Sequence, residues 1–361
     1  MKGELEHLCF KWRSSAFFVR KVLIMIITKT PFRMSFFGGG TDMESFFREY
    51  GGAVLSTTFD KYCYVTVRHL PRFFDYTTHL TYSKAEYITD IASIKHPAIR
   101  NAMKLLDMHE IRLIYEADLP ARSGLGTSSS FAVGMLNAFY ALKGKYADKK
   151  RLADEAIYLE REMCQEAGGW QDQIAASFGG MNRINFNKDG TYDVIPVIIH
   201  PDRKKQLNDN LLMFFTGFTR FSSDMQKANA VGYSEKVKQL QEMLSLVDDA
   251  QIILEDKHSD LDEFGRLLDK TWRLKRQTGG AITTNSIDEL YEKGISAGAL
   301  GGKLLGAGGG GFLVFYVQPE KRDAVINEMK DLLYIPFKFE DGGTQVIHYT
   351  PESYTAVEEA V

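Results

Sequence analysis

The stretch "PARSGLGTSSS", residues 120–130, lies between a pattern typical of a β-strand and a pattern typical of a helix. Upstream, "IRLIYEADLP" (111–120) alternates apolar and polar residues and ends at a proline. Downstream, residues 128–144 carry one apolar helical face before a glycine, made by Phe131, Met135, Phe139 and Leu142. A strand, a glycine loop and a helix in this order predict a turn whose helix amides face a bound anion.

The residue types in this loop suit an anion. Gly124 and Gly126 allow backbone N–H groups to approach it closely, and residues 127–130 add four hydroxyls. The stretch is not a Walker A loop, because no lysine follows Gly126, and it does not match GxGxxG either. The alternative is a helix N-terminus capped by serine or threonine without any ligand. We favour the anion site because strand, glycines, hydroxyls and helix occur together.

Two other stretches are also rich in glycine. "PFRMSFFGGGTD" (31–42) places Arg33 and Asp42, which carry opposite charge, on either side of three glycines. "GAGGGGF" (306–312) precedes an apolar strand pattern. For this last stretch two interpretations stay open: its glycines let two backbones pack closely, or they leave room for a substrate or nucleotide.

Composition limits the class of protein. The chain of 361 residues is long enough for two domains, and 44% hydrophobic with 25% charged residues is typical of a soluble globular protein. A formal net charge of −3 argues against nucleic-acid or membrane-surface binding. The three cysteines, Cys9, Cys63 and Cys164, are scattered, which indicates reduced thiols in a cytoplasmic protein. The eight histidines show no zinc-ligand spacing.

The beginning of the chain and the domain boundary follow from local patterns. "KVLIMII" (21–27) is too short to span a bilayer and is interpreted as the first β-strand. Met25 is a candidate natural start, which makes residues 1–24 a possible extension. A polar stretch places the boundary near residue 205, between domains at 25–205 and 206–361.

Together, the three glycine-rich stretches resemble the three motifs of the GHMP kinase superfamily, in the family's order. The resemblance covers roughly residues 26–350. Within the superfamily, stretches such as "FRMSFFGGGTD" and "GGWQDQIAASFGGMN" are similar to the D-glycero-D-manno-heptose 7-phosphate kinases. Galactokinases carry Gly-Glu-His-Thr-Asp in the first motif, so Gly39 and Gly40 stand where they have polar side chains. This departure argues against galactose as the substrate.

The resemblance implies a fold and a set of ligands. The expected fold is α+β, with an N-terminal domain like domain 2 of ribosomal protein S5 and a ferredoxin-like C-terminal domain. The active site would lie in the cleft between them. The implied ligands are ATP, Mg²⁺ and a sugar phosphate. We expect a cytoplasmic protein without nucleic-acid or membrane partners, and a homodimer is possible.

The resemblance also assigns the catalytic and ATP-binding residues. Asp172 corresponds to the family's catalytic aspartate, with Arg33 as the cation beside it. The ATP phosphates would lie on Gly124, Leu125, Gly126, Thr127, Ser128 and Ser129. Glu160 and Ser128 would hold Mg²⁺. Without the resemblance, the simpler interpretation places Glu160 on a solvated helix face. Asp172 would then be a helix N-cap and Arg33 part of a surface ion pair.

For the acceptor sugar the resemblance is less specific. The candidate residues near the sugar are Gly39, Gly40, Asp42, Gly308 and Gly309. A phosphate at the far end of the sugar needs cations, and the candidates are Arg220, Arg276 and Lys303, with Lys275 beside Arg276. Trp170 and Trp272 either line the site or belong to the core.

The function expected from the resemblance is transfer of phosphate from ATP to the anomeric C1 hydroxyl of D-glycero-D-manno-heptose 7-phosphate. The product would serve nucleotide-activated heptose and surface-glycan synthesis. The alternatives are a C1 kinase of another sugar such as L-fucose, and a non-catalytic sensor of sugar and ATP. Retention of Arg33, Asp42, Glu160 and Asp172 argues against the sensor.

Overall fold

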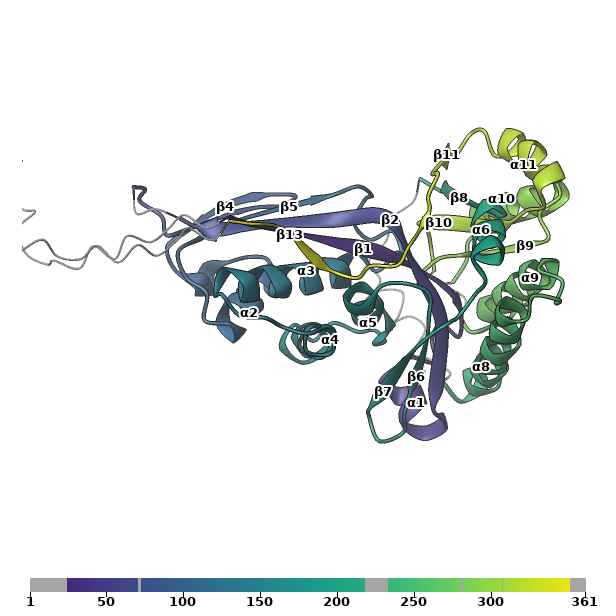
Figure 1. Cartoon of the computed structure of the whole chain (residues 1–361), viewed down its shortest axis with the longest axis horizontal. Helices are drawn as coiled ribbons and strands as arrows, with labels where there is room; N and C mark the ends of the chain where they lie inside the picture. Colours follow the sequence, from purple (N-terminus) through teal and green to yellow (C-terminus); the bar gives the residue numbers. More distant parts are fainter. Residues whose placement is uncertain (1–24, 71–72, 218–232, 280–281, 307, 351–361) are drawn as a thin grey trace, which may run out of the picture.

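The computed structural model describes residues 25–70, 73–217, 233–279, 282–306 and 308–350 (Figure 1). The possible extension at 1–24 and the candidate Arg220 lie outside the described residues. The described part contains two sheets and helices packed against both, which confirms the predicted α+β class.

A large sheet dominates the first part of the chain. Within the described residues it has nine strands. They are β1 (Met25–Phe37), β2 (Gly52–His69), β3 (Thr78–Thr81), β4 (Ala85–Ile88), β5 (Ile111–Ala117), β6 (Asn182–Phe186), β7 (Tyr192–Pro196), β12 (Phe339–Glu340) and β13 (Gln345–Tyr349). The main path runs β13-β1-β2-β5-β3-β4; β6 and β12 pair with β2, and β7 pairs with β6. β1 continues through Phe37, so Arg33 lies on a strand and the loop begins only at Gly38.

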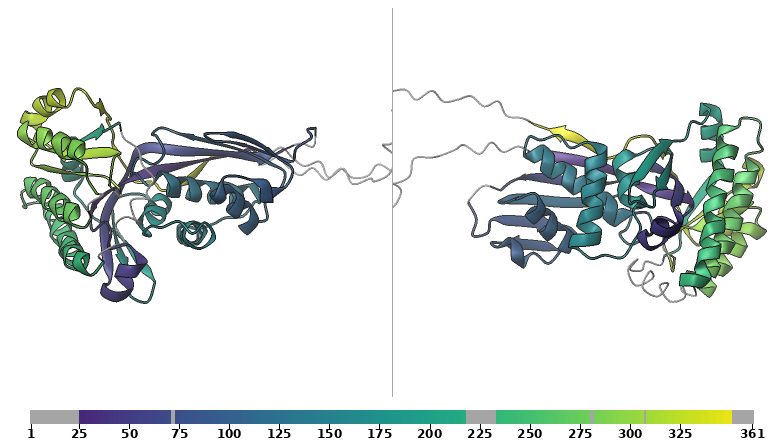
Figure 2. Two further views of the ribbon diagram at one scale, coloured as in Figure 1. Left: turned by 180° about the vertical axis from the view of Figure 1, so that it is seen from behind. Right: turned by 90° about the horizontal axis from the view of Figure 1, so that it is seen from below.

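Helices α2 to α5 lie on one side of this sheet (Figures 1 and 2). The helices of this part are α1 (Glu44–Tyr50), α2 (Pro97–Leu105), α3 (Thr127–Leu142), α4 (Lys149–Tyr158) and α5 (Gln171–Phe178), with a 3₁₀ turn η1 (Ile91–Ser93). The predicted apolar face of α3 is buried against the sheet, and most of its remaining residues are buried too. The second side of α3 contacts α4 and α5, which explains a helix that is apolar almost all round.

Helix α4 is followed directly by a π-helical turn. Asp148 caps the start of α4 by accepting a hydrogen bond from the Arg151 amide. After Tyr158 the chain forms a π-helical turn, η2 (Leu159–Met163). Such turns are rare and frequently lie at functional sites. This one carries Glu160.

The second part of the chain forms a smaller antiparallel sheet in the order β11-β8-β10-β9. Its strands are β8 (Leu211–Phe215), β9 (Gly301–Leu304), β10 (Phe312–Tyr316) and β11 (Leu333–Tyr334). The surrounding helices are α6 (Pro201–Asp209), α8 (Tyr233–Glu255), α9 (Asp262–Gln277), α10 (Asn285–Ser296) and α11 (Arg322–Glu328), with a 3₁₀ turn η3 (Pro319–Lys321). β10 is buried at every residue, so its pattern is a continuous apolar run.

One hydrophobic cluster contains residues of both parts. The ring of Phe264 on α9 meets Phe36 and Phe37 at the end of β1 edge to face, with centroid distances of 5.2 and 5.1 Å. Lys303 on β9 donates hydrogen bonds to the carbonyl oxygens of Ser35 and Phe36. The end of β1, which carries the first glycine loop, is therefore held by residues from both parts.

The end of the described chain returns to the large sheet. β12 pairs with β2 and β13 pairs with β1, both antiparallel. The boundary near residue 205 falls within α6. The division into 25–205 and 206–361 stays a prediction, and residues 339–349 belong to the large sheet by their pairing.

Candidate active site

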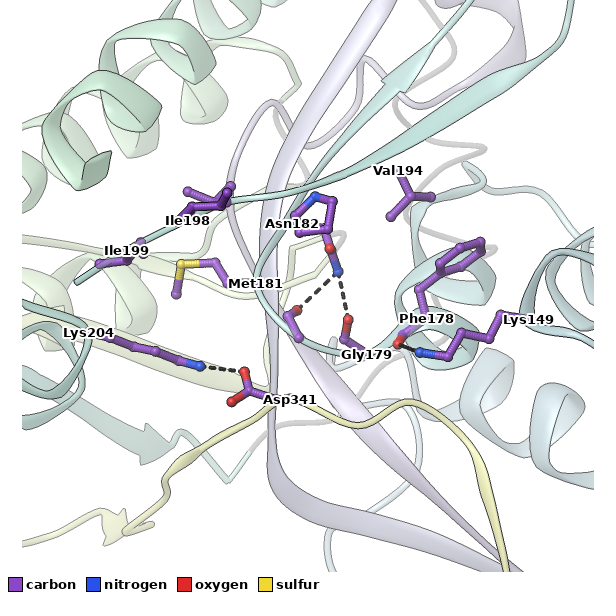
Figure 3. A pocket seen from close by; sticks show the side chains of 13 residues that line it. Lys149, Phe178, Gly179, Met181, Asn182, Val194, Ile198, Ile199, Lys204 and Asp341 are labelled. Carbon is purple, nitrogen blue, oxygen red and sulfur yellow. Dashed lines mark hydrogen bonds and ion pairs between the residues drawn. The ribbon is translucent and has the colours of Figure 1, made fainter. Parts of the chain in front are cut away.

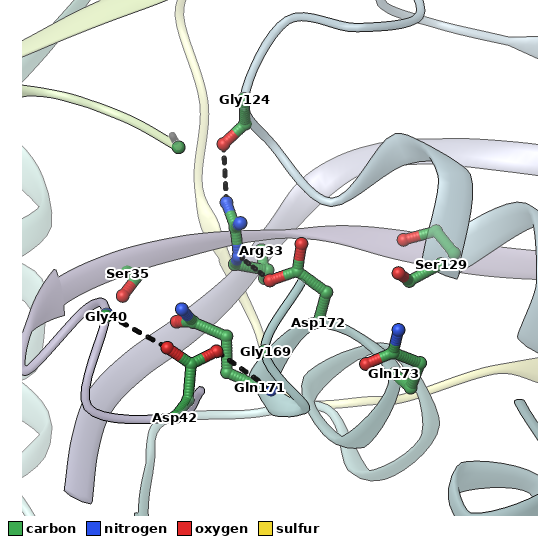
Figure 4. A network of polar contacts seen from close by, with 12 residues as sticks. Arg33, Ser35, Gly40, Asp42, Gly124, Ser129, Gly169, Gln171, Asp172 and Gln173 are labelled. Atoms are coloured by element: carbon green, nitrogen blue, oxygen red, sulfur yellow. Dashed lines mark hydrogen bonds and ion pairs between the residues drawn. The ribbon is translucent and has the colours of Figure 1, made fainter. Parts of the chain in front are cut away.

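Arg33 and Asp172 form an ion pair at the centre of the candidate site (Figure 4). Arg33 points from β1, and Asp172 lies in the first turn of α5. Arg33 Nε donates to Asp172 Oδ1 at 2.7 Å, and Arg33 Nη1 donates to the Gly124 carbonyl at 2.6 Å. The arginine side chain is 5% exposed and the aspartate 25%. Because the guanidinium binds two acceptors at once, it is held in one orientation, and the carboxylate keeps an accessible edge.

The loop of residues 122–126 lies directly against this pair. Gly126 has a φ of +72°, and a β-carbon there would lie 3.3 Å from Cγ of both Arg33 and Asp172. No side chain caps α3, whose N-cap residue is Gly126. The alternative of serine or threonine capping is therefore wrong for this helix. Its first amides and the positive end of its dipole are left for an anion, which supports the predicted phosphate site.

Ser128 and Ser129 bind Glu160, which lies more than thirty positions later in the chain. The Ser128 hydroxyl donates to Glu160 Oε1 at 2.9 Å and the Ser129 hydroxyl to Oε2 at 2.7 Å. Glu160 is 1% exposed, which excludes the solvated helix face. The π-helical turn places its carboxylate over the first turn of α3, so the structure brings together the residues that the resemblance assigned to magnesium.

Two residues that the sequence did not single out hold Glu160 in place. Gln173 Nε2 donates to Glu160 Oε2, and Arg161 lies 3.8 Å from the same oxygen. Arg161 also donates to the carbonyls of Glu166 and Gly169, which bridges η2 to the start of α5. The only sequence signal was proximity: Gln173 follows Asp172, and Arg161 follows Glu160.

Asp42 is buried and bonded to the main chain. Oδ1 accepts from the Gly40 amide at 2.9 Å and Oδ2 from the Gln171 amide at 3.4 Å. Burial first, and then the nearby charge of Asp172, raise the pKa of the Asp42 carboxyl. A β-carbon on Gly169 would lie 1.8 Å from Asp42 Oδ2, so only glycine fits there. The two predicted aspartates thus lie close enough to interact.

The glycines of the third stretch serve close packing of two backbones. A β-carbon on Gly306 would lie 2.3 Å from the Gly124 Cα, and one on Gly311 would lie 2.1 Å from the Ser123 carbonyl oxygen. Gly308 and Gly309 pack on Ile282, whose carbonyl accepts from the Gly309 amide at 2.9 Å. This favours the first of the two interpretations of 306–312. The predicted sugar contacts of Gly308 and Gly309 stay predictions.

The basic candidates lie in different surroundings. Lys303 is 2% exposed with its ammonium on two carbonyls, and burial lowers its pKa. Arg276 forms an ion pair with Asp288 at 3.0 Å and is 26% exposed. Lys275 donates to the Gly306 carbonyl, and burial followed by the charge of Arg33 lowers its pKa to about 8.

The two tryptophans differ in burial. Trp272 is fully buried beside Tyr291 and belongs to the core. Trp170 is half-buried and meets Phe47 edge to face at 4.8 Å. The Trp170 amide donates to the Asp42 carbonyl, so its main chain contributes to the site.

A cavity of about 510 Å³ lies away from these residues, against α4, α5, β6 and β7 (Figure 3). Its lining includes Phe178, Asn182, Ile198, Lys204 and Asp341 and none of the predicted site residues. Among the described residues, no cluster of three or more His, Cys, Asp or Glu could hold a metal ion, and no helix is long and apolar enough to cross a membrane.

Two segments of the chain match models of known protein domains. Residues 89–180 match the GHMP kinases N terminal domain and residues 251–335 match the GHMP kinases C terminal domain. The chain belongs to the GHMP kinases. This confirms the family predicted from the three motifs. In the structure, the three glycine-rich stretches of this GHMP kinase lie against one another: Arg33 binds the Gly124 carbonyl, and Gly306 packs on Gly124.

Individual GHMP kinases resemble the chain over most of its length. It is 29% identical over 318 residues to the D-glycero-alpha-D-manno-heptose 7-phosphate kinase of Campylobacter jejuni, which covers 84% of this chain and 93% of that protein. It is 28% identical over 206 residues to the bifunctional fucokinase/GDP-fucose pyrophosphorylase of Arabidopsis thaliana, which covers 54% of this chain and 19% of that protein.

Solved structures show the same fold. A crystal structure of a D-glycero-D-manno-heptose 1-phosphate kinase from Bacteroides thetaiotaomicron superimposes with a TM-score of 0.73 at 24% identity, covering 90% of this chain and 100% of that chain. A putative sugar kinase from Campylobacter jejuni superimposes with a TM-score of 0.65 at 25% identity, covering 93% and 100%. The predicted GHMP kinase fold is confirmed.

Proposed function

We propose that this GHMP kinase transfers the γ-phosphoryl group of ATP to the anomeric C1 hydroxyl of D-glycero-D-manno-heptose 7-phosphate. The product would be heptose 1,7-bisphosphate, a precursor for nucleotide-activated heptose and surface glycans. The similarity to the Campylobacter jejuni heptose 7-phosphate kinase over 93% of that protein supports the choice of substrate.

The observation that carries the proposal is the Arg33–Asp172 pair beneath the N-terminus of α3. In the proposed reaction, the C1 oxygen attacks the γ-phosphorus, the bond to the β-phosphate oxygen breaks, and ADP leaves. Asp172 accepts the hydroxyl proton. Arg33 orients Asp172 through their ion pair and stabilises negative charge on the transferring group.

The loop of residues 124–129 would bind the ATP phosphates through the uncapped amides of α3. Ser128 and Glu160 fit Mg²⁺ because both offer oxygen ligands and already touch at 2.9 Å. Mg²⁺ commonly takes one or two protein oxygens together with substrate phosphates and water, so a larger cluster of acidic residues is not required. When bound, the ion would neutralise phosphate charge.

The phosphate at C7 needs a cation on the far side of the acceptor. The candidates remain Arg220, Arg276 and Lys303. Of the two described ones, Arg276 is the more accessible, because Lys303 is buried with its ammonium on two carbonyls. A homodimer and a cytoplasmic location also remain predictions.

The substrate is tested with purified protein, MgATP and a panel of sugars. We expect ADP formation that depends on D-glycero-D-manno-heptose 7-phosphate and a product phosphorylated at C1. Asp172→Asn serves as the inactive control. Turnover of unphosphorylated L-fucose with none on heptose 7-phosphate would replace this proposal by the second candidate, a fucose C1 kinase. The partial similarity to fucokinases is the observation that favours that candidate.

A further inference from the structure

Two buried polar side chains beside Asp42 each carry an oxygen with no hydrogen-bond partner among the described residues. They are Ser35, whose Oγ is unpaired, and Gln171, whose Oε1 is unpaired. The residues are 5% and 9% exposed. Both lie next to Asp42 in Figure 4, on the side of the site away from Ser129. Buried polar atoms without partners cost free energy, and these two, unlike the others, both lie at Gly39 beside Asp42, so they favour a ligand bound at this place.

The two side chains come from different elements and meet at Gly39. Ser35 lies on β1 and Gln171 is the first residue of α5. A β-carbon on Gly39 would lie 3.8 Å from Ser35 Oγ and 4.0 Å from Gln171 Nε2, both ordinary contacts. The space between them is therefore bordered by polar groups from β1, α5 and the first glycine loop.

The fold requires glycine at positions 38 and 40 but not at position 39. A β-carbon on Gly38 would lie 1.9 Å from the Ala53 carbonyl oxygen, and Gly40 has a φ of +104°. Both positions need glycine for the fold. Gly39 has neither a clash nor a positive φ, so the protein itself would accept a side chain there. A ligand that occupies the space explains its absence.

The chemistry of these groups selects the kind of ligand. A serine hydroxyl both donates and accepts, a glutamine amide does the same through two atoms, and the Asp42 carboxylate accepts. Neutral hydroxyl groups satisfy all three. A phosphate would be repelled by the carboxylate of Asp42, and an apolar group would leave Ser35 and Gln171 unpaired.

We propose that Ser35 and Gln171 are two further specificity-determining residues, whose side chains bind ring hydroxyls of the acceptor sugar in the space at Gly39 beside Asp42. The inference rests on the proposed function and deepens it. It adds two hydroxyl-binding side chains to the earlier sugar-site candidates Gly39 and Asp42, and it gives the reason why Gly39 would limit the size of the sugar.

The test compares Ser35→Ala, Gln171→Ala and Gly39→Ala in the full-length protein. For each, the KM values for heptose 7-phosphate and ATP and the Kd of heptose 7-phosphate by calorimetry without ATP are measured. Loss of one neutral hydrogen bond is expected to raise the KM and Kd for the sugar about three- to tenfold. Gly39→Ala is expected to raise them at least about tenfold by steric exclusion. The KM for ATP should stay unchanged in all three.

The matched control is Ser177→Ala. Ser177 Oγ is also fully buried and unpaired, on the same helix as Gln171, and lies at the opposite end of that helix. Its replacement is expected to leave the sugar KM within twofold. If Ser35→Ala and Gln171→Ala also bind the sugar within twofold of wild type, water satisfies these atoms and the inference is wrong.

Mono-deoxy analogues of heptose 7-phosphate separate direct contact from a general disturbance. For the analogue that lacks the bound hydroxyl, wild type and Ser35→Ala should bind equally. An equal loss on every analogue would contradict direct contact. If wild type transfers phosphate to L-fucose instead, the proposed function fails, and the same variants measured with fucose decide the subsite. If calorimetry detects no sugar binding, both are overturned.

Discussion

Arg33 and Asp42 come from one short stretch of the chain and have opposite surroundings. Arg33 is bonded to a carboxylate and to a carbonyl from two other segments. The Asp42 carboxylate accepts hydrogen bonds from the amides of Gly40 and Gln171 and lies near the like charge of Asp172. Burial, followed by that like charge, raises its pKa. Beside it, Ser35 and Gln171 keep unpaired atoms.

Under the proposed function, this difference means that the Arg33–Asp172 pair is already in place in the protein alone, whereas the side at Asp42 would be completed by the sugar. A preorganised reacting centre avoids reorganisation during phosphoryl transfer. An incomplete acceptor side selects ligands that supply the missing hydrogen bonds. The two aspartates should therefore respond differently when their charges are removed.

Asp172→Asn should give the largest effect. It removes the proton acceptor, so kcat is expected to fall by about 10³-fold or more. It also leaves Arg33 buried without its ionised partner, which should lower the free energy of unfolding by about 1–3 kcal/mol. Single-turnover kinetics and chemical denaturation measure the two effects. Asp341→Asn is the control, because it removes only an exposed ion pair with Lys204. Unchanged sugar-dependent ADP formation in Asp172→Asn would refute the assigned mechanism.

Gly124→Ala tests whether the loop junction supports the Arg33 side. A β-carbon there would lie 2.4 Å from the Leu305 carbonyl oxygen at a φ of +82°. We expect a loss of about 2–4 kcal/mol in the free energy of unfolding, with a lower kcat because Arg33 binds the Gly124 carbonyl. Gly144→Ala is the matched control: its φ is +66° and no atom lies within 4 Å, so only about 1 kcal/mol should be lost. Equal losses would show that the junction is not tightly packed.

Asp42→Asn should weaken sugar use and yet stabilise the fold. Loss of a charged acceptor is expected to lower kcat/KM for the sugar about ten- to a hundredfold. The folded-state pKa of Asp42 is raised above 3.8, so its charge destabilises the folded protein at neutral pH. The variant should thus be more stable than wild type at pH 7, and the gain should vanish as the pH falls towards 3.8. Denaturation between pH 4 and 8 measures this; a destabilised variant at pH 7 would remove the contrast with Asp172.

Lys275→Met should have the smallest effect, on the pH dependence of stability. Its pKa is lowered from 10.5 to about 8, first by burial and then by Arg33, against the opposing effect of Asp42; Lys303 is the other nearby cation. Below about pH 8 the buried charge costs stability, and this cost is relieved as the pH rises from 8 towards 10.5. The stability gain of the variant should be larger at pH 7 than at pH 9.5, by thermal and chemical denaturation. A gain that is the same at both values would mean that Lys275 does not titrate in this range.

The sequence predicted the elements that carry strong local signals. The strand at 111–117, the turn at 124–126 and the helix from 127 lie as expected because alternation, positive-φ glycines and an apolar face all agree. The pairing of Arg33 with Asp172 and of Ser128 with Glu160 came from the family resemblance. No local pattern links positions so far apart.

Other features lacked any local signal. Glu160 was ambiguous because the stretch "LEREM" is mostly charged, although the helical spacing of Glu160 from Ala156 and Ile157 puts it on the buried face. Lys303 looked like a phosphate ligand, yet the carbonyls of Ser35 and Phe36 bind its ammonium, and that contact depends on how two sheets pack. Ser35 and Gln171 became visible only once their unpaired atoms could be identified.

The pairing of β13 with β1 determines when the large sheet can be completed during protein synthesis. Residues 26–29 find their partners at 345–349, more than three hundred positions later. During synthesis on the ribosome, the edge of β1 therefore stays open until nearly the whole described chain has emerged. Such long-range pairing slows folding and leaves a strand edge exposed to other nascent chains. A chain that ended before residue 345 would contain the smaller sheet and most of the large one, but it would lack strand β13 beside β1.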